Sequence, residues 1–324
     1  MRIISEQDAR ALVSIEDAIA VVERSFGAMA RKKARNYPVI REPVGLQDAV
    51  YGVKAGCDGA LPLLGLKAGG YWPRNVERGL GNHQSSTLLF DPDTGRASAL
   101  VSANYLTGLR TGAASAIATR HLSRPESSVL GIIGAGAQSE YQLRATLAVR
   151  AIRSVHVWDP SARNLGAFGY IVRQLGLRYV EEPDCEAVAG HADILITATP
   201  SQKALVERAW VRPGTHICAM GADTKGKQEL DPALVAHAAL FADEIAQATA
   251  IGECQHAYDA GLIGEHSFRG SIGALIEGLC EGRRSAQEIT LFDGTAAGSG
   301  CGRVRRRHGH RTGARHHCRL LDWH

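Results

Sequence analysis

One segment limits the folds open to this chain more than any other: VLGIIGAGAQSEYQLRATL, residues 129–147. Its first five residues predict a buried strand, the glycines predict a tight turn, and the remainder is typical of a helix. A GxGxx[GAS] match is weak by itself, but Gly134, Gly136 and Ser139 stand at the strand-to-helix junction that a dinucleotide site requires. The segment therefore predicts the first βα unit of a doubly wound sheet, with a pyrophosphate bound at the helix N-terminus.

An acidic residue after the next predicted strand indicates which dinucleotide binds. Asp159 ends SVHVWD, about 20 residues beyond the glycines, where a carboxylate can bind the adenosine ribose hydroxyls and repels the 2′-phosphate of NADP. NAD, as NADH, is therefore the expected cofactor. The alternative is a plain βα turn in which Asp159 only caps the following helix. Neither interpretation identifies a substrate.

A change in the pattern of apolar and polar residues divides the chain into two predicted domains. From residue 129 onward strands and helices alternate, which predicts a parallel sheet covered on both faces. Before it, an amphipathic helix at 14–33 and an Ala-rich helix at 107–121 flank short apolar runs, which include a hairpin with the turn DPDTG. The predicted class is α/β, with a doubly wound Rossmann domain over 123–295 and an α+β domain over 1–122.

The charge and cysteine patterns exclude several classes of partner. Residues 301–324 hold seven Arg and one Asp, so the net charge of +4 is confined there, and the rest of the chain has 30 basic and 32 acidic residues. This balance leaves no basic face for nucleic acid. No run approaches the ~18 apolar residues of a membrane span, and the start of the chain lacks the pattern of a secretory signal. We expect a cytoplasmic protein whose scattered cysteines are reduced thiols, without a metal site.

Charged residues in apolar, Gly-rich surroundings are candidate substrate ligands, because buried cations need anionic partners. Lys67 lies within LGLKAGGYW, where desolvation disfavours the charged amine and so favours proton transfer. Arg110 begins the Ala-rich helix and can hold a carboxylate through two guanidinium nitrogens. Asp223 follows a buried strand, at the edge of the sheet where ligands bind. Internal salt bridges are the alternative. The full set of cations is Arg41, Lys54, Lys67, His83 and Arg110.

Longer stretches resemble the ornithine cyclodeaminase/mu-crystallin family, from about residue 3 to about residue 295. The motifs that carry the resemblance are VIREP, LGLKAGGYWPRN, GNHQSSTLLFDPDTG, YLTGLRTGAASAIATRHL, GIIGAGAQSEYQLRA, GADTKGKQELDPAL and LFDGT. Members of this family fold as an NAD-binding Rossmann domain and a substrate domain that also forms the dimer. The resemblance implies an oxidoreductase that acts on a small imine or ketimine as a homodimer, without a nucleic-acid or membrane partner.

The resemblance also implies roles for individual residues. Arg41 and Arg110 match the arginines that bind the substrate carboxylate. Lys67 matches the active-site lysine, and Asp223 matches the catalytic aspartate that is its partner. Ser85 falls where the family has a hydroxyl near the nicotinamide. The positions that match the cofactor site are Gly134, Gly136, Ala137, Gln138, Asp159, Thr197, Asp293, Gly294 and Thr295.

Within the family, stretches such as YGVKAG and DEIAQATAIGECQHA are closest to the iminosuccinate reductases. Lys54 stands thirteen residues before Lys67, where ornithine cyclodeaminase has an acid that receives the substrate's amine. A cation there disfavours a diamine and favours a second carboxylate, which Lys54 or His83 would hold. We therefore expect NADH-dependent reduction of iminosuccinate to L-aspartate, with Lys67 and Asp223 handling the proton on the substrate nitrogen.

Three alternatives stay open on the sequence. The chain could be an ornithine or lysine cyclodeaminase, a reductase of a cyclic ketimine such as pyrroline-2-carboxylate, or a crystallin-like protein that binds NAD(P)H without turnover. Lys54 argues against the diamine substrates. A protein that only binds the cofactor would need neither Lys67 nor Asp223, and both are present.

Residues 296–324 depart from the family pattern. Where the family continues with a Gly-rich turn and a C-terminal helix, this chain is rich in Arg and His, a composition that resembles a high-GC gene read in a shifted frame. We expect an atypical tail in place of the C-terminal helix, with consequences for dimerisation and activity.

Overall fold

A computed structural model of the chain describes residues 1–295, and the predicted Arg- and His-rich tail, 296–324, lies outside the described residues. The chain divides into two units, the first ending at Arg110 and the second beginning at Thr111. This division falls inside helix α3 (Asn104–Leu122). The domain boundary predicted from the sequence, between residues 122 and 123, lies at the end of the same helix.

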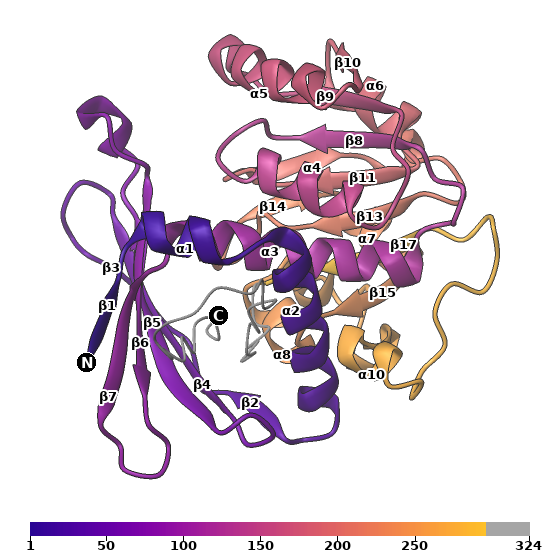
Figure 1. The fold of residues 1–324 in the computed structure, drawn as a ribbon. Coiled ribbons are helices and arrows are strands. Elements are labelled where there is room, and N and C mark those ends of the chain that lie inside the picture. The colour runs from indigo at the N-terminus through magenta and orange to yellow at the C-terminus, as the bar shows by residue number, and fades with distance from the viewer. Residues whose placement is uncertain (296–324) are drawn as a thin grey trace, which may run out of the picture. The chain divides into compact units, whose positions relative to one another are not determined.

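The first unit contains a seven-stranded, largely antiparallel sheet (Figure 1). Its strand order is β1-β7-β6-β5-β4-β2, and β3 also pairs with β4. The long strands β4 (Val50–Asp58), β5 (Leu63–Tyr71) and β6 (His83–Phe90) lie together within it. The other elements are β1 (Arg2–Ile4), α1 (Glu6–Leu12), α2 (Ile15–Ala30), β2 (Ala34–Asn36), β3 (Ile40–Pro43), a 3-10 helix (Asn75–Arg78) and β7 (Ala97–Ser102).

Local hydrogen bonds explain where two predicted elements of this unit begin and turn. The Ser14 hydroxyl accepts a hydrogen bond from Asp17 N at 3.1 Å, and the Asp17 carboxylate accepts from Ser14 N at 3.2 Å. This capping box satisfies two N–H groups at the start of α2. Strands β6 and β7 form the predicted hairpin, in which Gly95 N donates to Asp91 O at 2.8 Å. Both the helix and the DPDTG turn are confirmed.

The second unit is a doubly wound α/β domain, as the sequence predicts. Its eight-stranded sheet has the order β10-β9-β8-β11-β13-β17-β15-β16, and all neighbouring pairs are parallel. The order reverses at β8, which places the switch point where such sheets bind ligands between β8 and β11. The strands are β8 (Val129–Ile133), β9 (Ser154–Trp158), β10 (Arg178–Glu181), β11 (Ile194–Thr197), β13 (His216–Ala219), β15 (Ala239–Ala242), β16 (Phe268–Ser271) and β17 (Thr290–Asp293), with a separate pair, β12 (Gln202–Val206) and β14 (Gln228–Leu230).

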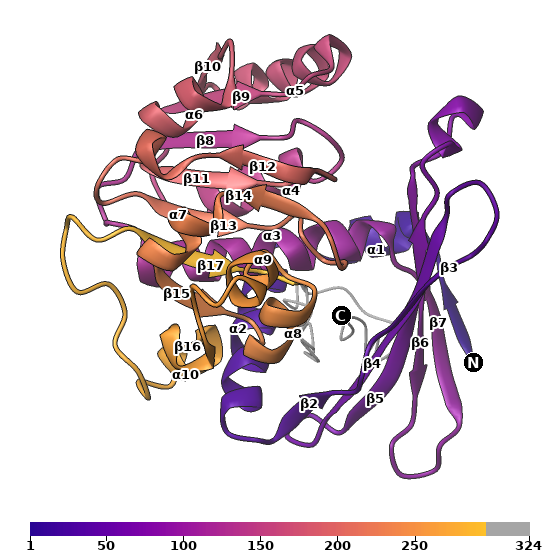
Figure 2. The same cartoon turned by 180° about the vertical axis from the view of Figure 1, so that it is seen from behind.

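Helices cover both faces of this parallel sheet. Helix α4 (Ser139–Leu147) lies over one face (Figure 1), and α6 (Cys185–His191) and α7 (Pro232–His237) lie over the other (Figure 2). The remaining helices are α5 (Ala162–Gln174), α8 (Ile245–Ala250), α9 (Gln255–Asp259), α10 (Ile272–Ile276) and the 3-10 helices Arg208–Trp210 and Glu265–Ser267. No helix within residues 1–295 is both long and apolar enough to cross a membrane.

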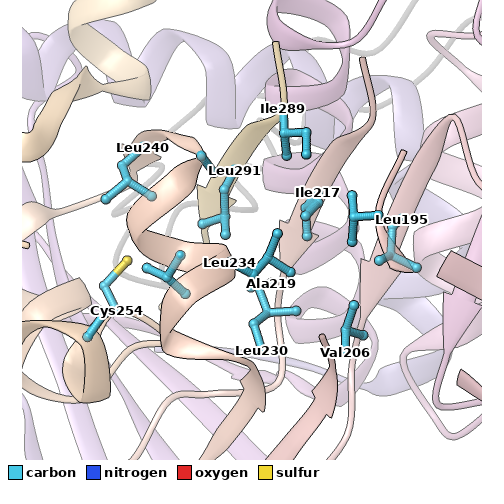
Figure 3. Packing of buried hydrophobic residues seen from close by; sticks show 14 of the residues in the cluster. Leu195, Val206, Ile217, Ala219, Leu230, Leu234, Leu240, Cys254, Ile289 and Leu291 are labelled. Atoms are coloured by element: carbon cyan, nitrogen blue, oxygen red, sulfur yellow. The ribbon is translucent and has the colours of Figure 1, made fainter. Parts of the chain in front are cut away.

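A large apolar core of this unit lies beneath α6 and α7 (Figure 3). Leu195 of β11, Ile217 of β13 and Leu291 of β17 project toward Leu234 of α7, and all four side chains are fully buried. Close packing of these side chains holds the ends of the strands in fixed positions. The core therefore holds in place the loops that follow β8, β11 and β13.

Leu234→Ala is expected to lower the free energy of unfolding by about 2–5 kcal/mol, because it removes buried methyl groups and leaves a cavity beside the sheet. Leu279 is 68% exposed, so Leu279→Ala is a matched control that should change the stability by less than about 0.5 kcal/mol. Urea unfolding curves of the two variants measure the difference. Equal midpoints would contradict this packing.

Candidate active site

Three of the predicted substrate-binding cations lie on one face of the sheet in the first unit. Lys54 on β4 stands directly opposite Lys67 on β5. Arg41 on β3 stands opposite Gly52, two residues before Lys54 on the same strand. Directly opposed residues share a face of a sheet, as do alternate residues along a strand. Cations gathered in this way repel one another and attract anions, so this face is suited to a substrate with negative charge.

Strand β6 brings two further predicted residues to the same face. Ser85 stands opposite Gly69 and His83 stands opposite Tyr71, and both partners lie an even number of residues from Lys67 along β5. The side chain of Ser85 is buried and that of His83 is half-buried. The pairing of the strands therefore gathers the predicted residues of β3, β4, β5 and β6, although contact of His83 with a substrate stays a prediction.

Hydrogen bonds connect this face to the first turns of α3. Lys67 is 8% exposed, and its Nζ donates to Thr107 Oγ1 at 3.4 Å. Thr107 Oγ1 lies 3.3 Å from Ser85 Oγ, and Ser85 N donates to Asn104 Oδ1 at 2.8 Å. Arg110 follows Thr107 by three residues, which places both on the same side of the helix. These bonds fix the lysine ammonium group relative to the helix that carries Arg110.

Asn104 and Thr107 were missed by sequence reasoning. The signal that could have found them is periodicity, since Asn104, Thr107 and Arg110 recur every three residues in YLTGLRTG and the residue before it. The charged member of this series was recognised because arginine has an evident use. Asn104 and Thr107 are neutral and position Ser85 and Lys67. No local sequence pattern indicates this role.

The predicted cofactor turn of the second unit has the geometry that a dinucleotide needs. Gly134 has φ +100°, and a Cβ there would lie 2.8 Å from Ala198 O, so glycine is required. Gly136 and Ala137 are exposed, and a Cβ on Gly136 would meet nothing within 4 Å. Ser139, in place of the third glycine, is buried and donates its hydroxyl to Gly136 O at 2.7 Å. The turn therefore packs against the protein at Gly134 and leaves space for a ligand beside Gly136.

The N-terminus of α4 lies directly after this turn. Gln138, which precedes the helix, makes no side-chain capping bond, and its buried Oε1 has no hydrogen-bond partner among residues 1–295. The first N–H groups of a helix carry a partial positive charge and suit a phosphate. The residues present therefore fit a dinucleotide pyrophosphate.

Asp159 lies beside the cofactor turn, 9% exposed. Its Oδ2 accepts a hydrogen bond from Ala135 N at 2.8 Å. Its Oδ1 accepts from Ser161 N at 2.8 Å and from Asn164 Nδ2 at 3.2 Å. The carboxylate therefore holds the start of α5 and also joins the two βα turns. An ionised carboxylate has about four acceptor sites, so ribose binding is compatible with these bonds and stays a prediction.

Thr197 points to an acid that sequence reasoning missed, Glu229 on β14. The Thr197 hydroxyl donates to Glu229 Oε2 at 2.8 Å. The same carboxylate accepts from Thr199 N at 2.6 Å and from Gly221 N at 2.9 Å. Glu229 is fully buried, and burial raises its pKa against the effect of these bonds. It ties together the loops that follow β11 and β13, whereas direct contact of Thr197 with a cofactor stays a prediction.

Asp223 lies in the loop after β13, two residues beyond the Gly221 amide that Glu229 holds. Its Oδ1 accepts from Lys227 Nζ at 2.8 Å and from Thr224 Oγ1 at 3.2 Å. Lys67 and Asp223 belong to different units, and their pairing stays a prediction.

The predicted nicotinamide loop, residues 293–295, is buried throughout. Asp293 Oδ2 accepts from Cys254 N at 2.9 Å, and Thr295 Oγ1 donates to Asp243 Oδ1 at 2.8 Å. A Cβ on Gly294 would lie 2.5 Å from Met220 Sδ, so only glycine fits there without displacing that side chain. These residues shape the end of β17, and their contact with nicotinamide stays a prediction.

Asp293 is expected to make stability depend on pH. Burial raises its pKa to about 7 from the ordinary 3.8, despite the hydrogen bond from Cys254 N. The folded chain therefore retains a proton that the unfolded chain releases, so the contribution of Asp293 to the free energy of unfolding falls as pH rises from about 4 to about 7 and then levels off. Each pKa unit corresponds to about 1.4 kcal/mol, which makes the decline a few kcal/mol.

Asp293→Asn, which resembles the protonated acid, should remove this part of the decline. Urea unfolding of both proteins between pH 5 and pH 8 measures the difference in slope. Burial also raises the pKa of Glu253, so a smaller decline should persist in the variant. Parallel profiles for the two proteins would contradict the titration of Asp293.

Comparison with known proteins gives a consistent set of relatives. The model of the ornithine cyclodeaminase/mu-crystallin family matches residues 2–298. Iminosuccinate reductase from Paracoccus denitrificans is 48% identical over 298 residues, 92% of each chain. The crystal structure of that enzyme in complex with NAD+ matches with a TM-score of 0.86 and 47% identity, over 92% of both chains.

Two further solved structures are similar over most of the chain. Thermococcus litoralis Δ1-pyrroline-2-carboxylate reductase in complex with NADH and L-proline has a TM-score of 0.87 at 30% identity, covering 91% of this chain and 92% of that one. An archaeal alanine dehydrogenase dimer with bound NAD has a TM-score of 0.86 at 35% identity, covering 91% and 90%.

Proposed function

Because the chain belongs to the ornithine cyclodeaminase/mu-crystallin family, we propose that it is an NADH-dependent imine reductase that converts iminosuccinate to L-aspartate. The observation that carries the proposal is the pairing of Lys54 with Lys67, with Arg41 on the same face. Iminosuccinate has two carboxylates, and a face with three cations complements a dianion better than a diamine or a singly charged ring.

The cofactor proposed is NADH, bound by the second unit. The open side of Gly136 and the N-terminus of α4 would hold the pyrophosphate, and Gln138 Oε1 would accept a hydrogen bond from a hydroxyl or N–H group of the cofactor. Asp159 would accept hydrogen bonds from the adenosine ribose. Bound NADH supplies the hydride that the imine carbon receives.

The first unit orients the substrate and supplies a proton. Arg41 and Arg110 would hold the carboxylate next to the imine, and Lys54, with His83, would hold the distal one. As the imine carbon is reduced, the electron pair of the C=N π bond moves to nitrogen, which takes a proton. Lys67 is positioned by Thr107 to donate that proton from Nζ, with Asp223 as the proposed partner in the proton transfer.

Oxaloacetate mixed with ammonia generates iminosuccinate in solution, which provides a direct assay. We expect NADH oxidation to require both components and to yield L-aspartate in equal amount, as measured by chiral chromatography. A reaction without ammonia serves as the control for reduction of the keto acid. Absence of aspartate from protein that still binds NADH would refute the proposal.

A cyclic ketimine is the second candidate substrate. The similarity to the Thermococcus litoralis pyrroline-2-carboxylate reductase, at a TM-score of 0.87, is the observation that favours it. Turnover of pyrroline-2-carboxylate without turnover of iminosuccinate would move the function to this reaction and leave Lys54 with a structural role.

We also propose that the chain acts as a homodimer in the cytoplasm. Exposed apolar side chains in the first unit could form the dimer interface. Ile40 and Tyr51 lie on the sheet face opposite the cations and are 57% and 42% exposed. Leu46 and Leu80, 70% and 55% exposed, lie in two loops that a hydrogen bond from Arg78 to Gln47 connects. A similar archaeal protein is a dimer. Light scattering of the intact chain tests the proposed dimer, and a monomeric mass would refute it.

The five cysteines within the described residues are free thiols, which supports the proposed location in the cytoplasm.

A further inference from the structure

A group of metal-ligand side chains lies in the second unit, and the proposed reaction uses none of them. His156 Nδ1 lies 2.6 Å from Glu182 Oε1, and His191 Nδ1 lies 3.1 Å from the same oxygen. The centroids of the two imidazole rings are 4.9 Å apart, with an interplanar angle of 30°. One potential ligand atom from each residue lies within 4.8 Å of the others. Two imidazoles thus converge on a single carboxylate oxygen.

The backbone of three elements sets this arrangement. His156 lies within β9, Glu182 directly follows β10, and His191 is the last residue of α6. Glu182 N donates to Val157 O at 2.9 Å, which holds the acid beside β9. The side chains of His156 and Glu182 are 12% and 9% exposed, and that of His191 is 57% exposed. The group is therefore rigid on its inner side and open to solvent on its outer side.

We propose that His156, Glu182 and His191 bind a divalent transition-metal ion, with Zn²⁺ best suited to the ligands. Two imidazole nitrogens and a carboxylate oxygen form a ligand set that Zn²⁺ accepts, and a fourth, open position would hold water. Tetrahedral ligands at ~2.0–2.1 Å from Zn²⁺ stand ~3.3 Å apart. The present separations of 2.6 and 3.1 Å need to widen by less than 1 Å, and the His191 side chain, 57% exposed, has solvent on its outer side into which it can move.

Each imidazole ring can bind a metal ion through Nδ1 without a change in the charge of the ring. His191 Nδ1 also lies 2.8 Å from Ala187 O, an acceptor, so this nitrogen carries a proton in the metal-free chain. A neutral imidazole can move that proton to Nε2 and present the Nδ1 lone pair to a metal. Glu182 supplies one negative charge toward the two positive charges of the ion. The metal would cross-link β9, β10 and α6, so it should raise the thermal stability of the chain.

The test is a titration of the intact chain with Co²⁺, a spectroscopic substitute for Zn²⁺, followed by calorimetry with Zn²⁺ itself. His191→Asn changes an exposed side chain and should abolish one cobalt site that shows d–d absorption without a sulfur-to-cobalt charge-transfer band. Its affinity for Zn²⁺ at that site should fall at least ~10-fold, since even outer-shell changes cost that much. Zn²⁺ should raise the melting temperature of the wild type more than that of the variant.

His237→Asn is the matched control, because His237 is also an exposed histidine at the end of a helix in the same unit. It should bind the same number of ions as the wild type. Glu182→Gln, which keeps the shape of the acid and removes its charge, should weaken the site as His191→Asn does. Equal stoichiometry and affinity in the wild type and His191→Asn would overturn the proposal, and would leave the three residues as a hydrogen-bonded group.

Discussion

Lys67→Met is expected to lower kcat for iminosuccinate by about 10²–10⁴, the range that a positioned acid or base contributes. Methionine keeps an unbranched side chain, one atom shorter than that of lysine, but cannot donate a proton to the substrate or a hydrogen bond to Thr107. NADH binding should change little, because the residues proposed to bind the pyrophosphate and the adenosine ribose belong to the other unit. Stopped-flow measurement of NADH oxidation under single-turnover conditions reports the chemical step directly.

Lys203→Met is the control for this substitution, since Lys203 is exposed on β12 and belongs to no proposed site. Its kcat should equal that of the wild type. If Lys67→Met retained a kcat within about tenfold of the wild type, another group would have to supply the proton, and the role of Lys67 would be limited to binding.

Lys54→Glu is expected to lower kcat/KM for iminosuccinate by about 10²–10³, because like-charge juxtaposition costs several kcal/mol. The new carboxylate would stand opposite Lys67 in the β4–β5 pair and would repel the distal carboxylate of the substrate. The effect should fall mainly on KM, since Lys54 is proposed to bind a group remote from the reacting carbon. Initial rates over a range of oxaloacetate concentrations at fixed ammonia measure it.

Lys54→Met separates loss of attraction from added repulsion. We expect an intermediate kcat/KM for this variant, because it removes a cation without placing an acid beside Lys67. Unchanged iminosuccinate activity in Lys54→Glu, without any gained activity on L-ornithine, would show that Lys54 does not select the substrate.

The cofactor unit could be predicted from the sequence because its signals are local. Gly134, Gly136 and Ser139 lie within six residues of one another, and the apolar run that precedes them predicts a buried strand. The interpretation of Asp159 as either a ribose ligand or a cap could not be decided in advance. The structure shows that its carboxylate makes capping bonds and also reaches the glycine turn at Ala135 N, which requires the strand order β9-β8.

The substrate face illustrates what a single sequence cannot supply. Lys54 and Lys67 face each other because Asp58 closes the β4–β5 turn by accepting from Ala60 N and Leu61 N. One residue more or less in that turn would move Lys54 to the other face of the sheet. Sequence reasoning identified both lysines from their surroundings, but the register that brings them together depends on the geometry of the turn.

Residues joined only by the tertiary fold were missed for the same reason. Glu229 is thirty-two residues from Thr197, and nothing in its own segment indicates that it binds two loops. His156, Glu182 and His191 have no motif spacing either, so their approach to one another could not be predicted from local patterns. Contacts across a parallel sheet depend on strand order, which one sequence does not specify.

The central claim is that the cation face selects a dicarboxylic imine, and the ratio of kcat/KM for iminosuccinate to kcat/KM for pyrroline-2-carboxylate tests it most directly. Both values come from NADH oxidation by one preparation of the wild-type chain at one pH. The contact of the Lys54 ammonium group with the distal carboxylate, together with a hydrogen bond from His83, predicts a ratio of about 10² or more in favour of iminosuccinate. A ratio near or below one would contradict the account, because the paired lysines would then contribute nothing to selection.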